Sequence, residues 1–268
     1  MQIIDALHNL RKARNGLSRG KLALVREART RADHVAVSIF VNPLQFGANE
    51  DLDAYPRQLE RDCALLRPLG VDIVWAPTAA EMYPAGYATT VSVSGVSEGL
   101  CGGARPGHFD GVATVVCKLF NQVRPDLALF GEKDWQQLAV IRRMARDLDL
   151  EYPREISGSP TVREADGLAL SSRNAYLSSD DRTRAAILPA AMKKAIAEIT
   201  AGKPVAEARN RLVAALLSGG FAAVDYAELC DAESLAVLTE RPTDFARLLV
   251  AARIGGTRLI DNMEAWSG

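Results

Sequence analysis

The sequence contains few residues of several types, and each shortage argues against a class of protein. Its 268 residues include four widely spaced cysteines without a Cys-x-x-Cys pair. This spacing argues against a zinc cluster or a disulfide framework and favours a reducing compartment. The histidines are His8, His34 and His108, and their spacing indicates no Ser-His-Asp or Cys-His catalytic set.

Net charge and long apolar runs are also lacking. The 32 basic and 33 acidic residues leave a formal charge of −1, which argues against nucleic acid or a membrane surface as a partner. No apolar run reaches the roughly 18 residues of a membrane span. The amino terminus becomes polar too early for a signal peptide. We therefore expect a cytoplasmic protein, in which local charges bind any anionic ligand.

The residues that are present predict an α/β fold. Apolar residues make up 48% of the chain, and apolar strand patterns alternate with helical ones up to about residue 165. The predicted strands are Val35–Val41, Val71–Trp75, a weaker Thr89–Val93 and Leu127–Phe130. Such alternation is typical of a Rossmann-like, doubly wound parallel sheet. Residues 11–16, before the helix predicted at Arg19–Arg31, are too charged for a buried strand, so the first strand of such a sheet is predicted to be missing.

The pattern changes in the last third of the chain. Helices are predicted near residues 180–200 and 205–218, followed by short strands near Val224–Leu229, Ala246–Ala252 and Arg258–Asp261. We therefore expect two domains. Residues 1–165 form the Rossmann-like domain, and residues 166–268 form a smaller α+β domain.

Two loops that follow predicted strands carry candidate ligand-binding side chains. Gln45 lies where an amide can bind a hydroxyl and a carboxylate together, although it can equally stabilise its own loop. Lys133 can point at a phosphate at the amino end of the next helix. Asp134 either caps that helix or binds a ribose or a metal-bound water, and Gln137 lies one turn further on.

A third segment, residues 166–174, contains two hydroxyls and a guanidinium in succession. Ser171, Ser172 and Arg173 are donors that suit a polyphosphate, although an interdomain hinge with helix-capping serines would have the same composition. The pair Gly102 and Gly103 lacks the Gly-x-Gly-x-x-Gly spacing, which disfavours nicotinamide binding.

Together these segments resemble the pantothenate synthetase (pantoate–β-alanine ligase) family. The resemblance covers the chain from about residue 15 onward. It depends on ordered motifs at residues 38–46, 55–57, 105–109, 118–121, 131–137, 166–174 and 259–262.

The resemblance implies a nucleotidyltransferase-type domain with a small carboxyl-terminal lid domain, ATP and Mg²⁺, and a homodimer. Pantoate would attack ATP to form pantoyl adenylate and pyrophosphate, and β-alanine would then displace AMP. By resemblance Gln45 and Gln137 bind pantoate, and Lys133 and Arg173 act in catalysis; no protein metal ligand is predicted. The implied ATP-binding residues are Gly131, Glu132, Lys133, Asp134, Val162, Leu170, Ser171, Ser172 and Arg173.

One part of the sequence departs from the family pattern. The family opens its first helix with His-x-Gly-His, where this chain has Ser18 and Lys21. Lys21 could place a cation near the phosphates, but on a long flexible stem. Two alternatives to an active ligase therefore stay open. One is an impaired or inactive member that acts as a ligand-binding or scaffold protein, and the other is a different nucleotidyltransferase of the same fold.

Overall fold

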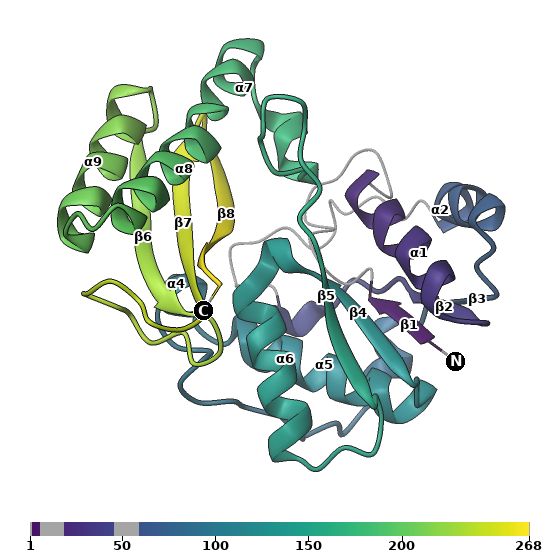
Figure 1. The fold of residues 1–268 in the computed structure, drawn as a ribbon. Helices are drawn as coiled ribbons and strands as arrows, with labels where there is room; N and C mark the ends of the chain where they lie inside the picture. Colours follow the sequence, from purple (N-terminus) through teal and green to yellow (C-terminus); the bar gives the residue numbers. More distant parts are fainter. Residues whose placement is uncertain (1, 6–18, 46–58, 268) are drawn as a thin grey trace. The chain divides into compact units, whose positions relative to one another are not determined.

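The computed structural model describes residues 2–5, 19–45 and 59–267, which divide into two compact units (Figure 1). The first, here called the parallel unit, comprises the described residues up to Glu132 together with Gln136–Thr161. The second, the antiparallel unit, comprises Lys133–Trp135 and the chain from Val162 onward. Two residues of the predicted ligand loop, Lys133 and Asp134, therefore belong to the second unit.

The parallel unit is built on a five-stranded sheet. Its strands are β1 (Gln2–Asp5), β2 (Val35–Ser38), β3 (Ile73–Trp75), β4 (Leu127–Gly131) and β5 (Glu155–Ser159). They are all parallel and lie in the order β3-β2-β1-β4-β5. The chain reverses its direction of winding between β1 and β4, which is the usual ligand position in such sheets. The predicted doubly wound parallel sheet is thus confirmed.

The prediction that the first strand is missing was wrong. β1 occupies the centre of the sheet and pairs with β2 on one side and β4 on the other. The strand lies at Gln2–Asp5 and not in residues 11–16, directly before the helix. A four-residue strand with a polar residue at each end has no readable period, and it forms because both neighbours supply hydrogen-bonding partners. The rest of the segment before the helix, residues 6–18, lies outside the described residues.

Helices cover both faces of this sheet. On α1 (Arg19–Arg31), Leu24 and Val25 pack with Val35, Val37, Leu127 and Leu129. The next residue of β4, Phe130, makes an edge-to-face contact with Phe120 of α5 (His108–Val123), with 6.3 Å between ring centroids. Since alternate strand residues face opposite sides, α1 and α5 lie on opposite faces. The remaining helical elements are η1 (Pro43–Gln45), α2 (Leu59–Leu66), η2 (Arg67–Leu69), α3 (Ala79–Met82), α4 (Leu100–Gly103), η3 (Glu132–Asp134) and α6 (Trp135–Asp147).

Two strand predictions in this unit need correction. Thr89–Val93 forms no strand; its backbone instead meets α5, where Val91 N–H donates to Thr114 Oγ1 at 2.9 Å. β5 was not predicted, because its sequence Glu-Ile-Ser-Gly-Ser offers one large apolar residue. As an edge strand, β5 pairs only with β4 and needs no continuous apolar run.

The antiparallel unit has the predicted α+β architecture. Strands β6 (Ala223–Asp231), β7 (Ala246–Ile254) and β8 (Thr257–Trp266) form one antiparallel sheet. α8 (Ile187–Thr200) and α9 (Val205–Ser218) share a buried core with it. A separate α7 (Ser179–Ala185) precedes α8, because the ring of Pro189 is incompatible with a helix continuing from Ala185. A short η4 (Ser172–Tyr176) comes first.

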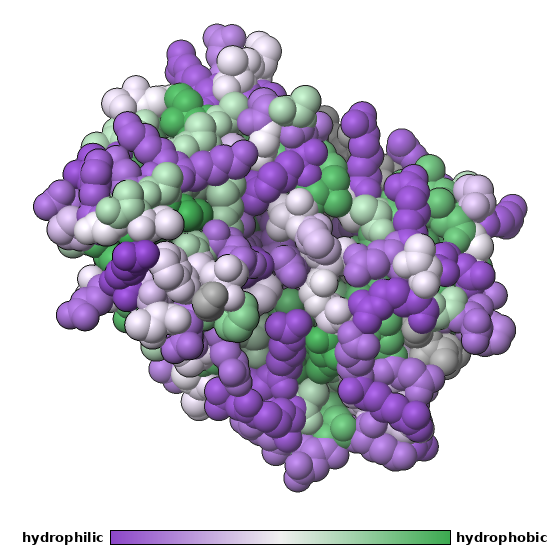
Figure 2. All heavy atoms as spheres, viewed as in Figure 1, coloured by the Kyte–Doolittle hydropathy of each residue, from purple (hydrophilic) through white to green (hydrophobic). Residues whose placement is uncertain are grey.

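The face drawn in Figure 2 is covered mostly by hydrophilic side chains, with apolar ones in small patches. This agrees with the apolar cores described above. Among the described residues, no helix is both long and apolar enough to cross a membrane.

Candidate functional site

Gln45 ends the short η1 turn that follows β2, and it is 8% exposed. Asn42 shapes this turn. Its Nδ2 donates to the Gly111 carbonyl at 2.9 Å, and its Oδ1 accepts from Leu44 N–H at 3.2 Å and from Tyr83 Oη at 2.8 Å. Burial raises the pKa of the Tyr83 phenol, so that this hydroxyl stays a donor. The backbone that carries Gln45 is therefore held from two other elements.

The amino end of α5 holds the same turn. A side chain at Gly111 would collide with the Leu44 carbonyl, so only glycine permits this approach. Arg105 and the His108 Nδ1 both lie 3.3 Å from the Gln45 carbonyl, and Arg105 Nη1 lies 2.9 Å from His108 Nε2. A guanidinium only donates, so Nε2 accepts and Nδ1 carries the proton shared with the carbonyl. Sequence reasoning left His108 without a role, and the structure gives it this one.

Gln137 lies in the first turn of α6, is 4% exposed, and its Oε1 accepts no hydrogen bond from any described residue. Its neighbour Gln136 is similarly buried, but both the oxygen and the nitrogen of its side-chain amide are hydrogen-bonded. Gln136 accepts from Cys101 N–H at 3.0 Å and donates to the carbonyls of Val96 and Glu98. A buried acceptor without a partner is uncommon and needs an explanation. A ligand hydroxyl would satisfy Gln137, whereas Gln136 holds the loop before α4.

The structure places Gln45 and Gln137 at the carboxyl edge of one sheet, after β2 and β4, with β1 between these strands. Ser38, which ends β2, adds a hydroxyl that is 1% exposed and has no partner among the described residues. Sequence reasoning treated Ser38 only as part of an apolar strand. Ser38 Oγ and Gln137 Oε1, which have no partner among the described residues, thus both lie at the edge where parallel sheets bind ligands.

The loop after β4 has two halves. Gly131 ends the strand and Glu132 begins η3, both in the parallel unit. Glu132 packs so closely on β5 that a side chain at Gly158 would collide with it. Lys133 and Asp134 follow and belong to the antiparallel unit.

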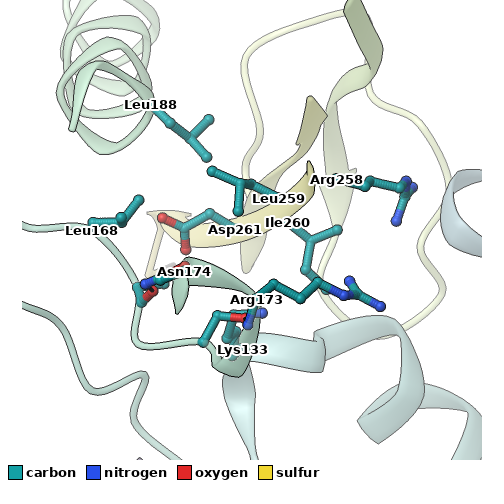
Figure 3. Close-up of a pocket in the computed structure, with 11 residues that line it drawn as sticks. Lys133, Leu168, Arg173, Asn174, Leu188, Arg258, Leu259, Ile260 and Asp261 are labelled. Carbon is teal, nitrogen blue, oxygen red and sulfur yellow. Dashed lines mark hydrogen bonds between the residues drawn. The ribbon is translucent and has the colours of Figure 1, made fainter. Parts of the chain in front are cut away.

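In the antiparallel unit, three of the predicted ATP-binding residues line one small pocket. Lys133, Ser171 and Arg173 lie there together with Asn174 and Asp261 (Figure 3). The other lining residues are Leu168, Ala169, Leu188, Arg258, Leu259 and Ile260. This pocket combines cationic, hydroxyl and amide groups, a donor set suited to phosphate oxygens.

Hydrogen bonds within this unit hold the backbone that carries the predicted ATP-binding residues. Leu170 N–H donates to the Val162 carbonyl at 2.9 Å, which closes the loop that precedes η4. Ser171 Oγ accepts from Arg173 N–H at 3.2 Å and so caps η4, as the hinge alternative expected. The described lining of the pocket does not include Asp134, Val162, Leu170 or Ser172.

Asn174 and Asp261 were not assigned roles from the sequence. Asn174 Nδ2 donates to the Ala169 carbonyl at 3.1 Å, while its buried Oδ1 has no partner among the described residues. Asp261 Oδ2 and Oδ1 accept from the Arg163 guanidinium at 2.7 and 2.9 Å. Asn174 thus offers a free acceptor to a ligand, while the charge of Asp261 is already compensated.

Lys21 lies in the first turn of α1 with its Nζ buried, and Ser18 falls outside the described residues. Within the described part of the chain, no three His, Cys, Asp or Glu side chains lie together as a metal site.

Comparisons with known proteins agree with these features. A family model described as pantoate-beta-alanine ligase matches residues 15–264. The pantothenate synthetase of Novosphingobium aromaticivorans is 62% identical over 281 aligned residues, covering 98% of this chain and 98% of the relative. That of Sphingopyxis alaskensis is 61% identical over 250 residues, covering 92% of this chain and 88% of the relative.

Solved structures show the same likeness. The pantothenate synthetase of Thermus thermophilus superimposes with a TM-score of 0.90 at 48% identity, covering 99% of this chain and 93% of that one. The pantoate-beta-alanine ligase of Francisella tularensis, solved with beta-gamma ATP and beta-alanine, gives 0.75 at 31% identity, covering 100% and 90%. This chain therefore belongs to the pantoate–β-alanine ligase family.

Proposed function

We propose that this protein condenses pantoate with β-alanine to pantothenate, using ATP and releasing AMP and pyrophosphate. Family membership supports the reaction class. The observation that carries the proposal for this chain is the buried Oε1 of Gln137 at the carboxyl edge of the parallel sheet, which has no hydrogen-bond partner among the described residues. A hydroxy acid such as pantoate has the hydroxyl that would donate to it.

The pantoate site is proposed to lie between the loops that follow β2 and β4. Gln45 and Gln137 supply one amide each, and Asn42 together with Arg105 and His108 keeps the Gln45 turn in place. Amides recognise a hydroxyl and a carboxylate by direction and without net charge. The carboxylate of pantoate then keeps its nucleophilic character.

The ATP site is proposed to use the nine residues named from the sequence. Gly131, Glu132, Lys133 and Asp134 lie after β4, Val162 and Leu170 pair in the loop before η4, and Ser171, Ser172 and Arg173 begin η4. The cations of Lys133 and Arg173 give these two residues the catalytic roles, since they can stabilise negative charge on the phosphates.

The chemistry needs little proton transfer in its first step. The pantoate carboxylate is ionised at neutral pH, so it attacks the α-phosphorus directly, and the bond to the pyrophosphate oxygen breaks. The β-alanine amine then attacks the acyl carbon, AMP leaves with the carboxyl oxygen, and the amine loses a proton. Positioning and charge neutralisation, supplied by fixed amides and cations, are therefore the main tasks of the protein.

Mg²⁺ is proposed to enter as part of the substrate, bound to the ATP phosphates. Among the described residues, no three His, Cys, Asp or Glu side chains lie together as a metal site. Mg²⁺ commonly uses phosphate oxygens and water with only one or two carboxylates.

Lys21 is proposed to replace the family's histidine pair as a cation toward the nucleotide. It occupies the first turn of α1, the helix that follows the central strand β1. A Lys21→Ala variant should then raise the KM for ATP about tenfold, since one charge-assisted contact is worth roughly 1.5 kcal/mol or more. An unchanged KM would remove Lys21 from the site.

Product release tests the whole proposal. Purified protein mixed with ATP, Mg²⁺, pantoate and β-alanine should release AMP and pyrophosphate in equal amounts, and omission of pantoate should abolish both. Release of neither product, while a relative with the His-x-Gly-His pair releases both, would refute the proposal. The inactive alternative is not favoured, because relatives at about 60% identity carry the name pantothenate synthetase.

Three further expectations stay predictions. Residues 1–165 and 166–268 are proposed as the ATP- and pantoate-binding domain and the lid domain. The protein is proposed to form a homodimer, which light scattering on the purified protein would test, and to reside in the cytoplasm.

A further inference from the structure

Asn262 of β8 is 3% exposed, and both ends of its side-chain amide are used. Its Oδ1 accepts from Arg247 Nη1 at 2.5 Å, and its Nδ2 donates to the Lys133 carbonyl at 2.9 Å. A guanidinium can only donate and a carbonyl can only accept. The two partners therefore determine which way the amide points, and the amide ties β8 to the backbone of Lys133.

Arg247 of β7 also contacts Trp135, which lies two positions after Lys133. Its guanidinium lies 3.6 Å from the centroid of the Trp135 ring, a cation–π distance. Trp135 Nε1 donates to the Ala232 carbonyl at 2.8 Å. The segment from Lys133 to Trp135 is thus fastened at both ends by one contiguous group, which we call the Arg247–Asn262 clamp.

Asp261, the residue before Asn262, contributes a carboxylate to the pocket that Lys133 lines. The side chain of Asp261 is 1% exposed. An uncompensated carboxylate there would repel a phosphate. Arg163 binds both of its oxygens, and Asn262 N–H donates to Oδ1 at 2.8 Å. β8 can therefore anchor Lys133 without presenting a bare negative charge to an anionic ligand.

We infer that Asn262, oriented by Arg247, is a positioning residue that places Lys133 for the reaction. This inference depends on the proposed function, in which Lys133 meets the ATP phosphates. A lysine ammonium ends a flexible four-carbon stem, so its reach is only as well defined as the backbone that bears it. Small misplacement of a catalytic group costs up to about a hundredfold in rate.

Asn262→Asp is the sharpest variant. It keeps an oxygen for Arg247 but turns an acceptor toward the Lys133 carbonyl, in place of a donor. Pyrophosphate release should slow about tenfold to a hundredfold. Arg247→Lys, which loses the planar fork, should act in the same direction. Arg209→Lys is the matched control: Arg209 also donates to a backbone carbonyl, that of Ala227 at 2.7 Å, in the same unit, but it is not part of the clamp.

A double-mutant cycle distinguishes positioning from general damage. If Asn262 acts through Lys133, the variant with both Asn262→Asp and Lys133→Ala should be no slower than Lys133→Ala alone. Multiplying losses, or a wild-type rate in Asn262→Asp, would overturn the inference. A wild type that releases no pyrophosphate refutes the proposed function instead.

Amide hydrogen exchange tests whether the clamp holds this segment, independently of enzyme activity. The amides of residues 133–135 should exchange faster in Asn262→Asp than in Arg209→Lys, while the amides of α8 and α9 exchange equally in both. Equal exchange at those amides in the two variants would overturn the inference.

Discussion

Two buried polar side chains at the carboxyl edge of the parallel sheet and two on the antiparallel sheet differ in whether they are hydrogen-bonded. At the carboxyl edge of the parallel sheet, Ser38 and Gln137 present buried oxygens without partners among the described residues. On the antiparallel sheet, the buried Asp261 and Asn262 are hydrogen-bonded at their side chains by Arg163 and Arg247. An unpartnered buried group costs free energy, which a ligand that binds to it can recover. Under the proposed function, Ser38 and Gln137 are kept for substrate, whereas Asp261 and Asn262 hold the structure in place.

The largest expected loss of stability comes from breaking the buried ion pair between Arg163 and Asp261. Arg163→Met leaves the Asp261 carboxylate buried with its charge uncompensated, which should lower the free energy of unfolding by roughly 3–5 kcal/mol. Urea denaturation at neutral pH measures this loss. Arg182→Met breaks a more exposed pair with Asp166 and should cost less than about 1 kcal/mol. Equal losses in the two variants would show that Asp261 does not depend on its partner.

The two neighbouring glutamines of α6 should respond in opposite ways. Gln137→Leu removes an unpartnered acceptor, so stability should hold while the KM for pantoate rises about tenfold to a hundredfold, equivalent to roughly 1.4–2.7 kcal/mol. Gln136→Leu strands the Cys101 N–H and should lower the free energy of unfolding by about 1–3 kcal/mol without changing that KM. Steady-state kinetics and urea denaturation of both variants decide this, and interchanged effects would contradict the assignment.

Like Gln137→Leu, a substitution at Ser38 should leave the stability of the fold nearly unchanged. Ser38→Ala deletes a hydroxyl that makes no hydrogen bond to a described residue, so the free energy of unfolding should change by less than about 1 kcal/mol. Ser171→Ala serves as the comparison, because Ser171 Oγ caps η4 and its loss should cost about 1 kcal/mol. A larger loss at Ser38 than at Ser171 would mean that Ser38 has a structural partner.

The smallest expected effect depends on pH. The hydrogen bond from Arg182 lowers the pKa of Asp166 below its ordinary value of 3.8. A lowered folded-state pKa stabilises the fold above pH 3.8, and the contribution is lost as pH falls through the folded pKa. Asp166→Asn should therefore cost under about 1 kcal/mol at pH 7 and nothing once Asp166 is protonated. A cost that does not change over this range would mean that the pair carries no charge effect.

Sequence periodicity worked best where packing is continuous and local. The run at Val35–Val41 contains β2, and Leu127–Phe130 covers all of β4 but its last residue. The predicted strands of the carboxyl-terminal third each cover part of β6, β7 or β8. It failed at β1 and β5, whose few apolar residues carry no period. Such short strands form through hydrogen bonds with neighbours distant in sequence, which no local pattern records.

The site shows the same division. Position after a strand was enough to propose Gln45 and Lys133 as candidates, because carboxyl ends of parallel strands share one edge. It could not tell Gln137 from Gln136, which are adjacent and equally buried and differ only in the loop that meets each. Nor could it find Asn262, whose partner Lys133 lies 129 positions away in the chain.

The sequence by itself thus determined the family, the alternation of strands and helices, and the residue types offered to pantoate and ATP, because motif order and local periodicity carry that information. The tertiary structure decided which strand occupies the centre of the sheet, which polar groups are already paired, and what anchors Lys133. Those outcomes depend on hydrogen bonds and charge compensation between segments far apart in the chain. They exist only once the segments have packed together.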